Sequence, residues 1–180
     1  VQPAEIPVEV RDVTITAELL KRTRKPVHTW VYNAVSARYI MELYQVVAGG
    51  SENLRTRPRG LLGFEPISPL TMSQDSVETL KVWVEAGQPV FIGPIVQSMT
   101  TGPVTLAGAL AQQDAEILAG LILVQALAPG VGAVYFGASL VADPRTGGAI
   151  FACPEQMLLT AGTVQLAHRH GLPAGVQVSL

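Results

Sequence analysis

Several side chains that could do chemistry stand at the ends of short apolar segments of this sequence. A carboxylate can act as a base or hold a cation, and an arginine can hold a carboxylate. Hydroxyl and amide groups can orient a polar ligand, and aromatic faces can accept a quaternary ammonium. The predicted substrate-binding residues are Asn33, Phe64, Glu65, Ser68, Gln97, Thr100, Thr101, Tyr135, Asp143 and Arg145.

Glu65 is the carboxylate that ends an otherwise uncharged segment beginning at Gly60. Burial at the mouth of a barrel would raise the pKa of this carboxyl and suit it to act as a base. It could equally stay ionised against a cationic ligand. The alternative is an ion pair with an arginine of the cluster Arg55, Arg57 and Arg59, and the sequence leaves these alternatives open.

Two loops carry the other polar candidates. Residues 97–102 are rich in hydroxyl groups and precede the longest predicted helix, so their free backbone N–H groups could bind an anion. In the loop 143–147, Asp143 and Arg145 could hold a polar substrate. The alternative for that loop is a turn in which the aspartate bonds its own backbone.

The sequence offers little for metal or thiol chemistry. It contains no H-x-x-x-H or C-x-x-C spacing, and His168 and His170 suit the end of a helix better than a metal. We therefore expect no metal bound by this chain. Cys153 precedes a helix start, where a reactive thiolate could form, but a small buried side chain is the favoured interpretation. No catalytic residue is assigned.

Strands and helices alternate in the pattern that must position these residues. Apolar runs bounded by Gly, Pro, Asn or Ser predict five strands, at residues 26–32, 60–67, 89–95, 132–138 and 173–178. The first predicted helix begins with a Thr16 cap and ends before Pro26. The other four predicted helices cover about 35–47, 73–87, 102–127 and 154–170. The second of these helices should bury one stripe, made of Val35, Tyr39, Leu43 and Val46.

Alternation of this kind predicts parallel strands joined by helical crossovers. The turn after the first strand is Asn33-Ala34-Val35-Ser36, which lacks the Gly-rich phosphate fingerprint of a nucleotide-binding sheet. The absence of this fingerprint favours a TIM-type (β/α)8 barrel over an open nucleotide-binding sheet. About five βα units are too few to close such a barrel. We therefore expect residues 1–180 to form a single partial barrel domain and to be a piece of a longer protein.

Composition excludes several classes of protein. Apolar residues make up 48% of the 180 and charged residues 14%, which excludes disorder, and the net charge of −2 makes nucleic acid an unexpected partner. Residues 117–142 carry no charge but are interrupted by Pro129, Gly130 and Gly132, which predicts a buried helix and strand rather than a membrane span. The single Cys153 suits a reducing compartment, so a cytoplasmic location is expected.

Several segments resemble the trimethylamine methyltransferase family. The clearest are Gly102–Leu110, Ala115–Gly120, Asp143–Gly147, Pro154–Glu155 with Leu158–Leu159, and Gly171–Pro173. Lys25–Asn33, Ser36–Tyr39 and Pro66–Leu70 fit the same family, so the resemblance covers nearly the whole chain.

This resemblance implies a TIM-type barrel that moves a methyl group from trimethylamine, or from a quaternary amine such as glycine betaine, to the Co(I) corrinoid of a partner protein. One branch of the family uses pyrrolysine, which is absent from these 180 residues. If a pyrrolysine belongs near Leu180, an amber codon read as a stop would end the chain there, and a sense codon after Leu180 would exclude this hypothesis. The favoured alternative is an arbitrary boundary, since Val1 also has the character of a cut end.

Two other interpretations stay open at this point. One is a non-catalytic fragment that acts only in protein association, and the other is a different barrel enzyme, such as a lyase with Glu65 as its base. An incomplete barrel has open strand edges, so a homo-oligomer is expected in either case.

Overall fold

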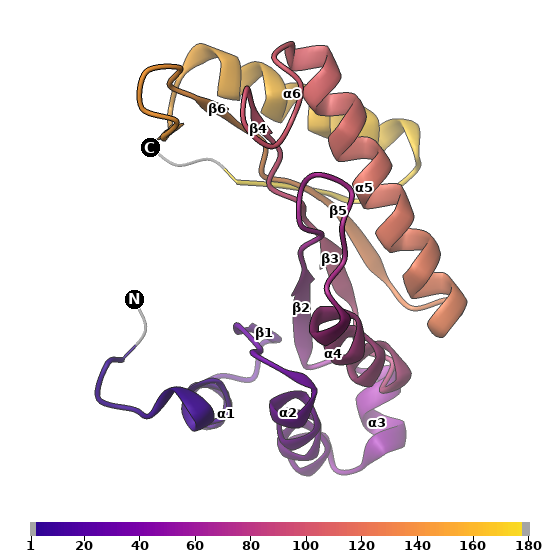
Figure 1. Ribbon diagram of the computed structural model, residues 1–180. Coiled ribbons are helices and arrows are strands. Elements are labelled where there is room, and N and C mark those ends of the chain that lie inside the picture. The colour runs from indigo at the N-terminus through magenta and orange to yellow at the C-terminus, as the bar shows by residue number, and fades with distance from the viewer. Residues whose placement is uncertain (1–2, 178–180) are drawn as a thin grey trace. The chain divides into compact units, whose positions relative to one another are not determined.

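A computed structural model describes residues 3–177 as alternating helices and strands (Figure 1). The first part contains α1 (Val8–Arg22), β1 (Val27–His28), α2 (Ala34–Ala48), α3 (Ser51–Thr56), β2 (Gly60–Phe64) and α4 (Gln74–Glu85). The second part contains β3 (Val90–Ile92), β4 (Gln97–Ser98), α5 (Leu106–Leu127), β5 (Ala133–Gly137), β6 (Leu140–Ala142), β7 (Ala149–Ile150), α6 (Pro154–Arg169) and β8 (Ala174–Val176).

The predicted α/β class is confirmed. Strands β1, β2, β3, β5 and β8 follow one another in a five-stranded sheet, and the pairs β1–β2 and β5–β8 are parallel. The remaining strands form a small second sheet in which β6 pairs with β4 in parallel and with β7 in antiparallel orientation. Closure of the five strands into a barrel stays a prediction.

By its contacts the chain forms two compact units. One comprises residues 1–63, 74–90 and 124–132, and the other comprises residues 64–73, 91–123 and 133–180. The border crosses β2 and β3, so the carboxyl ends of these strands and the loops that follow them belong to the second unit.

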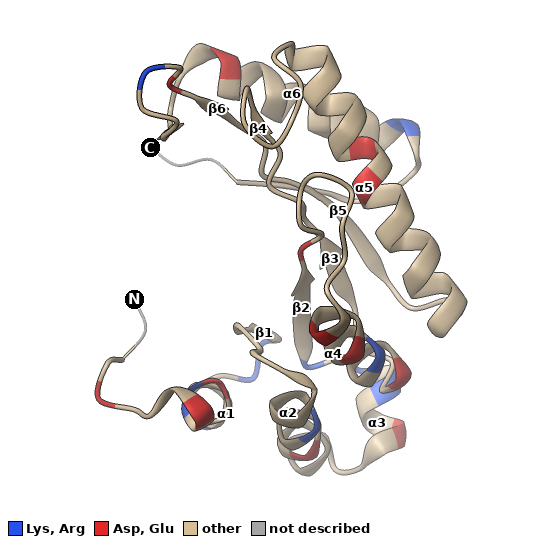
Figure 2. Cartoon of the chain, viewed as in Figure 1, with Lys and Arg blue, Asp and Glu red and all other residues tan. Residues whose placement is uncertain are grey.

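Most of the charged side chains lie on α1 to α4, and few lie on α5 and α6 (Figure 2).

The core of the first unit forms around the start of β2. Tyr44 of α2 and Trp83 of α4 meet edge to face with ring centroids 5.8 Å apart, and both are fully buried. They lie so close to Gly60 that a β-carbon there would come within 2.6 Å of the Trp83 ring. The buried amide of Gln88 then accepts hydrogen bonds from the backbone N–H groups of Arg59 and Gly60. Strand β2 is thus fixed to its helices by ring packing and by one side-chain amide.

The core of the second unit contains small residues where helices cross strands. A β-carbon at Gly120 of α5 would lie 2.6 Å from Ile92 of β3, so the helix backbone packs closely against the strand there. The rings of Phe91 and Phe136 pack with their centroids 4.7 Å apart and their planes tilted by 38°. Since these side chains are apolar and closely packed, the unit is stabilised mainly by burial.

The structure corrects the predicted start of the first helix. Helix α1 begins at Val8, after Pro7, so Thr16 is a mid-helix residue rather than the cap. Thr16 is buried and its hydroxyl donates to the Asp12 carbonyl one turn earlier, an alternative to capping that threonine often uses. It also shares a hydrogen bond of 3.0 Å with Thr29, which follows β1.

The predicted stripe of α2 is also wrong. Val35, Tyr39 and Val46 are exposed, at 56%, 56% and 81% of their surface. The buried side chains are Ser36, Ala37, Ile40, Met41 and Tyr44. Helix α2 contacts α1 and α4, so the contacts with these two helices decide which face of α2 is buried.

Helix α5 begins later than predicted, at Leu106, so Pro103 is not its first residue. The Thr105 hydroxyl accepts from the Gly108 N–H and caps the helix instead. The strands of the main sheet are shorter than predicted, and the sequence did not predict α3, β4, β6 or β7. Residue 178 of the last predicted strand lies outside the described residues. The helix and strand predicted within residues 117–142 are present as the end of α5 and β5, but this end of α5 is only partly buried, with Ile122 71% exposed.

Within residues 3–177, α5 is the helix that is long and apolar enough to cross a membrane by length and composition. It also carries Gln112, Gln113, Asp114 and Glu116, all of which hydrogen-bond to other parts of the chain. These polar side chains of α5 are therefore bonded within the fold, although only 33% of the most apolar window of the helix is buried.

Candidate active site

The loops that follow β2, β3 and β5 all belong to the second unit. The Phe64 carbonyl at the end of β2 accepts from the Gly93 N–H just after β3, 2.9 Å away. Beyond β3, Gln97 pairs with Leu140, which follows β5. The carboxyl ends of these strands therefore lie next to one another, as the parallel arrangement predicts.

Glu116 of α5 joins the first two of these loops. It is 2% exposed, and its carboxylate accepts from the Ser68 hydroxyl at 2.6 Å and from the Leu70 N–H at 2.9 Å. It also accepts from the Gln112 amide at 2.9 Å, and that amide donates to the Thr101 carbonyl at 2.9 Å. The predicted site residues Ser68 and Thr101 are thus connected through one buried carboxylate.

A second network on α5 reaches the loop after β5. The Gln113 side chain is fully buried, accepts from the Ser139 hydroxyl at 2.6 Å and donates to the Thr163 hydroxyl of α6 at 2.9 Å. Because both ends of its amide are used, the orientation of this side chain is fixed. Helix α5 therefore holds Ser139 and α6 in register with each other.

The loop 97–102 is a self-contained turn. The Gln97 carbonyl accepts from the N–H groups of Thr100, Thr101 and Gly102, and the Gln97 N–H donates to the Thr101 hydroxyl. These amides are occupied and α5 begins only at Leu106, so the expectation that they are free to bind an anion is wrong. The side chains of Gln97, Thr100 and Thr101 still stand at the strand ends, and their role in binding stays a prediction.

The loop of Asp143 and Arg145 is also bonded to itself. The Asp143 carboxylate accepts from the Arg145 N–H at 2.8 Å and lies 3.5 Å from its guanidinium. The Gln97 side chain donates to the Gly147 carbonyl at 3.1 Å, which fixes this loop to the one after β3. The turn predicted as an alternative is therefore present, and the exposed Arg145 guanidinium remains accessible from outside.

Tyr135 lies deeper than a ligand-facing aromatic would. It is fully buried in β5, and its hydroxyl donates to Asp114 of α5 at 2.9 Å. The same carboxylate oxygen lies 2.9 Å from Nε2 of His170, whose ring stacks on Tyr135. Burial, together with the Asp114 carboxylate, raises the pKa of Tyr135 above its usual value. This arrangement gives Tyr135 and His170 structural partners.

The remaining candidates are placed as follows. Phe64 is buried against Gly120, within the core. Glu65 follows it directly and is half-buried. Asn33 lies in the first unit, where its side chain accepts from the Ser36 N–H and caps α2. Among residues 3–177 no three His, Cys, Asp or Glu side chains are grouped closely enough to hold a metal ion.

Sequence reasoning missed Glu116 and its neighbours on α5. Their signal was the presence of Gln112, Gln113, Asp114 and Glu116 in a helix that is otherwise apolar. Buried polar side chains need partners, so such a group predicts fixed contacts to neighbouring loops.

These features define the class of the protein: an α/β chain of parallel strands with polar loops gathered at the carboxyl ends. The sequence model of one family, described as Trimethylamine methyltransferase (MTTB), matches residues 1–179. The chain therefore belongs to the trimethylamine methyltransferase family.

Individual relatives agree with this assignment. The chain is 30% identical over 173 residues to a glycine betaine methyltransferase of Desulfitobacterium hafniense (strain Y51), covering 96% of this chain and 36% of the relative. It is 31% identical over 167 residues to the trimethylamine methyltransferase MttB1 of Methanosarcina mazei, covering 92% and 34%. The chain thus spans about a third of the length of these relatives.

Proposed function

We propose that this chain forms part of a TIM-type barrel methyltransferase. The donor is trimethylamine or a quaternary amine such as glycine betaine, and the acceptor is the Co(I) corrinoid of a partner protein. The observation that carries the proposal is the family match over residues 1–179, together with relatives named for these two amines. The parallel pairs β1–β2 and β5–β8 support the barrel.

In this reaction the corrinoid of the partner protein would supply the nucleophile that takes the methyl carbon. The donor nitrogen must carry a positive charge, as a quaternary ammonium or as protonated trimethylamine, so that it keeps the electrons of the broken carbon–nitrogen bond and leaves as a neutral amine with one methyl group fewer. The protein must therefore orient the ammonium and exclude water, and positioning of this kind supplies much of an enzyme's rate gain.

The residues at the strand ends suit that task. The carboxylate of Glu65 would stabilise the ammonium cation, and the guanidinium of Arg145 and the hydroxyl of Thr100 would hold the carboxylate of a betaine. Glu116 holds the loops that carry Ser68 and Thr101, so it acts as a positioning residue.

The test uses the protein in its natural full length, with a reduced corrinoid protein and either trimethylamine or glycine betaine. Methyl transfer changes the absorbance of the corrinoid, and we expect this change with one amine. A trimethylamine or glycine betaine methyltransferase serves as the positive control for the same corrinoid protein. If the control transfers methyl groups and this protein transfers none from either amine, the proposal is wrong.

We further propose a cytoplasmic, self-associating protein. The single Cys153 is not in a disulfide, which suits a reducing compartment. Strands β1 and β8 stand at the two ends of the sheet order, and open strand edges favour association. Light scattering of the 180-residue chain, in which these two edges are open, gives its mass in solution, and a monomer would refute the self-association.

A further inference from the structure

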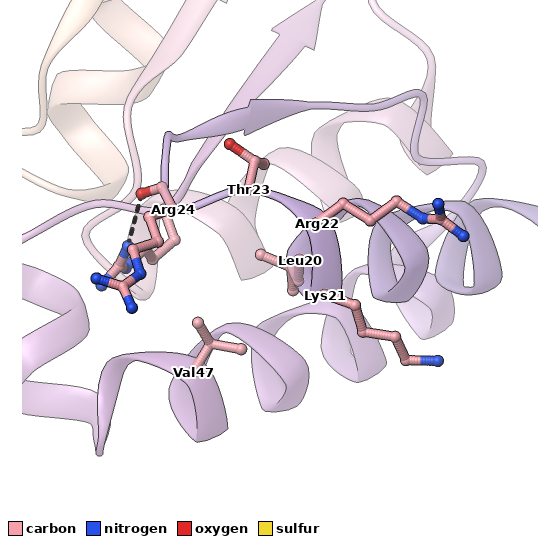
Figure 3. Close-up of a pocket in the computed structure, with 7 residues that line it drawn as sticks. Leu20, Lys21, Arg22, Thr23, Arg24 and Val47 are labelled. Atoms are coloured by element: carbon pink, nitrogen blue, oxygen red, sulfur yellow. Dashed lines mark hydrogen bonds between the residues drawn. The ribbon is translucent and has the colours of Figure 1, made fainter.

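The strand starts of the first unit carry a pocket rich in positive charge. It has a volume of about 550 Å³ and lies between the end of α1, the end of α2 and the residue that precedes β2 (Figure 3). Its lining residues are Leu20, Lys21, Arg22, Thr23, Arg24, Val47 and Arg59. No acidic side chain is among these lining residues.

Two of the four basic residues already have an acidic partner. Lys21 and Arg22 lie 2.7 Å and 3.4 Å from the carboxylate of Glu18, one turn earlier on α1. These two cations lower the pKa of Glu18, Lys21 being the larger cause. In Figure 3 the Lys21 and Arg22 side chains extend along α1, away from Arg24. The positive charge that is left to attract an anion belongs to Arg24 and Arg59.

Neither Arg24 nor Arg59 has an ion-pair partner among residues 3–177. Arg59 donates one hydrogen bond, from Nη1 to the Arg24 backbone carbonyl at 3.0 Å. Its Nε is buried and has no hydrogen-bond partner in that part of the chain. A guanidinium has five N–H donors in a planar fork that matches phosphate and carboxylate oxygens, so most of the capacity of Arg59 is unused.

The Arg59 side chain also lines a neighbouring pocket of about 260 Å³, together with Arg57, Asn53 and Thr56. Donors therefore stand on both sides of Arg59. The carbonyl ends of α1 and α2 both border the pocket and disfavour an anion. Lys21 and Arg22 in the last turn of α1 exceed the charge of Glu18 and offset the field of that helix, so Arg24 and Arg59 must outweigh the field of α2. Cations held together without a carboxylate repel one another, and a bound anion removes that cost.

We propose that this pocket binds a small anion that carries phosphate groups, held chiefly by the guanidinium groups of Arg24 and Arg59. Its volume is that of a small-molecule pocket, and a multiply charged anion fits the surplus positive charge. The pocket lies at the amino ends of β1 and β2, whereas the candidate active site lies at the carboxyl ends of strands. The proposal therefore does not depend on the methyl-transfer reaction.

The probe for the test is inorganic pyrophosphate, titrated calorimetrically into the intact protein at low salt. Citrate provides a polycarboxylate arm, a short poly-glutamate peptide provides an acidic-polypeptide arm, and sodium chloride of equal ionic strength controls for screening. The variants are Arg24→Gln and Arg59→Gln. Arg38→Gln is the matched control, because Arg38 is exposed on α2 and does not line the pocket.

We expect pyrophosphate to bind the parent and the Arg38→Gln variant alike, and each pocket variant to bind about tenfold more weakly. Arg24→Gln keeps the hydrogen bond from Arg59, since the acceptor is a backbone oxygen, so this variant should fold even if Arg59→Gln does not. Equal weakening in Arg38→Gln, or no binding by the parent, would overturn the proposal. If citrate or poly-glutamate binds and pyrophosphate does not, the assignment of a phosphate ligand is wrong.

Discussion

Replacing Glu116 tests whether one buried carboxylate holds the candidate active-site loops together. In Glu116→Ala three donors lose their acceptor: the Ser68 hydroxyl, the Leu70 N–H and the Gln112 amide. In Glu116→Gln the amide oxygen can still accept from Leu70 and Gln112. The new amide nitrogen can donate to the Ser68 hydroxyl, which is able to accept.

The two variants should therefore differ in stability. A buried donor that loses its partner costs about 1–3 kcal/mol, and exposed parts of the loop recover some of this from water. We expect Glu116→Ala to lower the free energy of unfolding by about 3–5 kcal/mol. Glu116→Gln should lower it by about 1 kcal/mol, because it loses only the charge of the acceptor.

Urea unfolding measures these changes, and amide hydrogen exchange shows where they act. Exchange should accelerate at residues 67–71 and 99–102 in Glu116→Ala. Glu42→Ala is the matched control, since Glu42 is exposed in the middle of α2, and its effect should stay within about 0.5 kcal/mol.

Equal losses for Glu116→Ala and Glu116→Gln would refute the reasoning, because they would show that the hydrogen bonds to Ser68 and Leu70 do not matter. Unchanged exchange at both loops in a destabilised Glu116→Ala would also refute it. The loss would then arise elsewhere than at the loops.

Three further changes can be measured by the same unfolding assay. Burial raises the pKa of Tyr44 in the folded chain, whereas an unfolded tyrosine titrates near pH 10. The buried, neutral Tyr44 side chain therefore stabilises the fold fully below pH 10, and this stabilisation is lost as the pH rises above 10. The Tyr44 hydroxyl has no hydrogen-bond partner among residues 3–177, so Tyr44→Phe should be at least as stable as the parent. The variant should also lose less stability at alkaline pH, and a steeper loss would contradict this reasoning. Gly137→Ala should cost about 1–3 kcal/mol because its β-carbon would overlap Thr163, and a neutral result would show that α6 can move away. Asn33→Ala removes the α2 cap and should cost about 1 kcal/mol, whereas no change would mean that water replaces the cap.

The order of elements was predictable because it depends on local signals. Apolar runs between Gly and Pro located all five strands of the main sheet, and Gly49 ends α2 in the left-handed conformation, as a helix-ending glycine should. Helix faces were harder to predict. On α2 Val35 and Tyr39 are exposed because the face that packs on α1 and α4 is the neighbouring one, which carries Ile40, Met41 and Tyr44.

The candidate site was predictable only at the level of loops. The rule that ligands bind at the carboxyl ends of parallel strands located the loops of Ser68, Thr101 and Asp143. It did not find Glu116, which lies on a helix 46 residues beyond Leu70 and reaches that loop only in the folded chain. Long-range pairs of this kind leave no periodic signal in the sequence.

The turn built on the Gln97 carbonyl is held by several hydrogen bonds to a single acceptor. Three backbone amides and the Thr100 hydroxyl donate to that one oxygen, so a change of Thr100 that removes its hydroxyl leaves the three backbone hydrogen bonds in place. Thr100 can be exchanged for larger, smaller or charged residues without rebuilding the backbone. A small library at this position would alter the chemistry of the strand ends while leaving the scaffold unchanged.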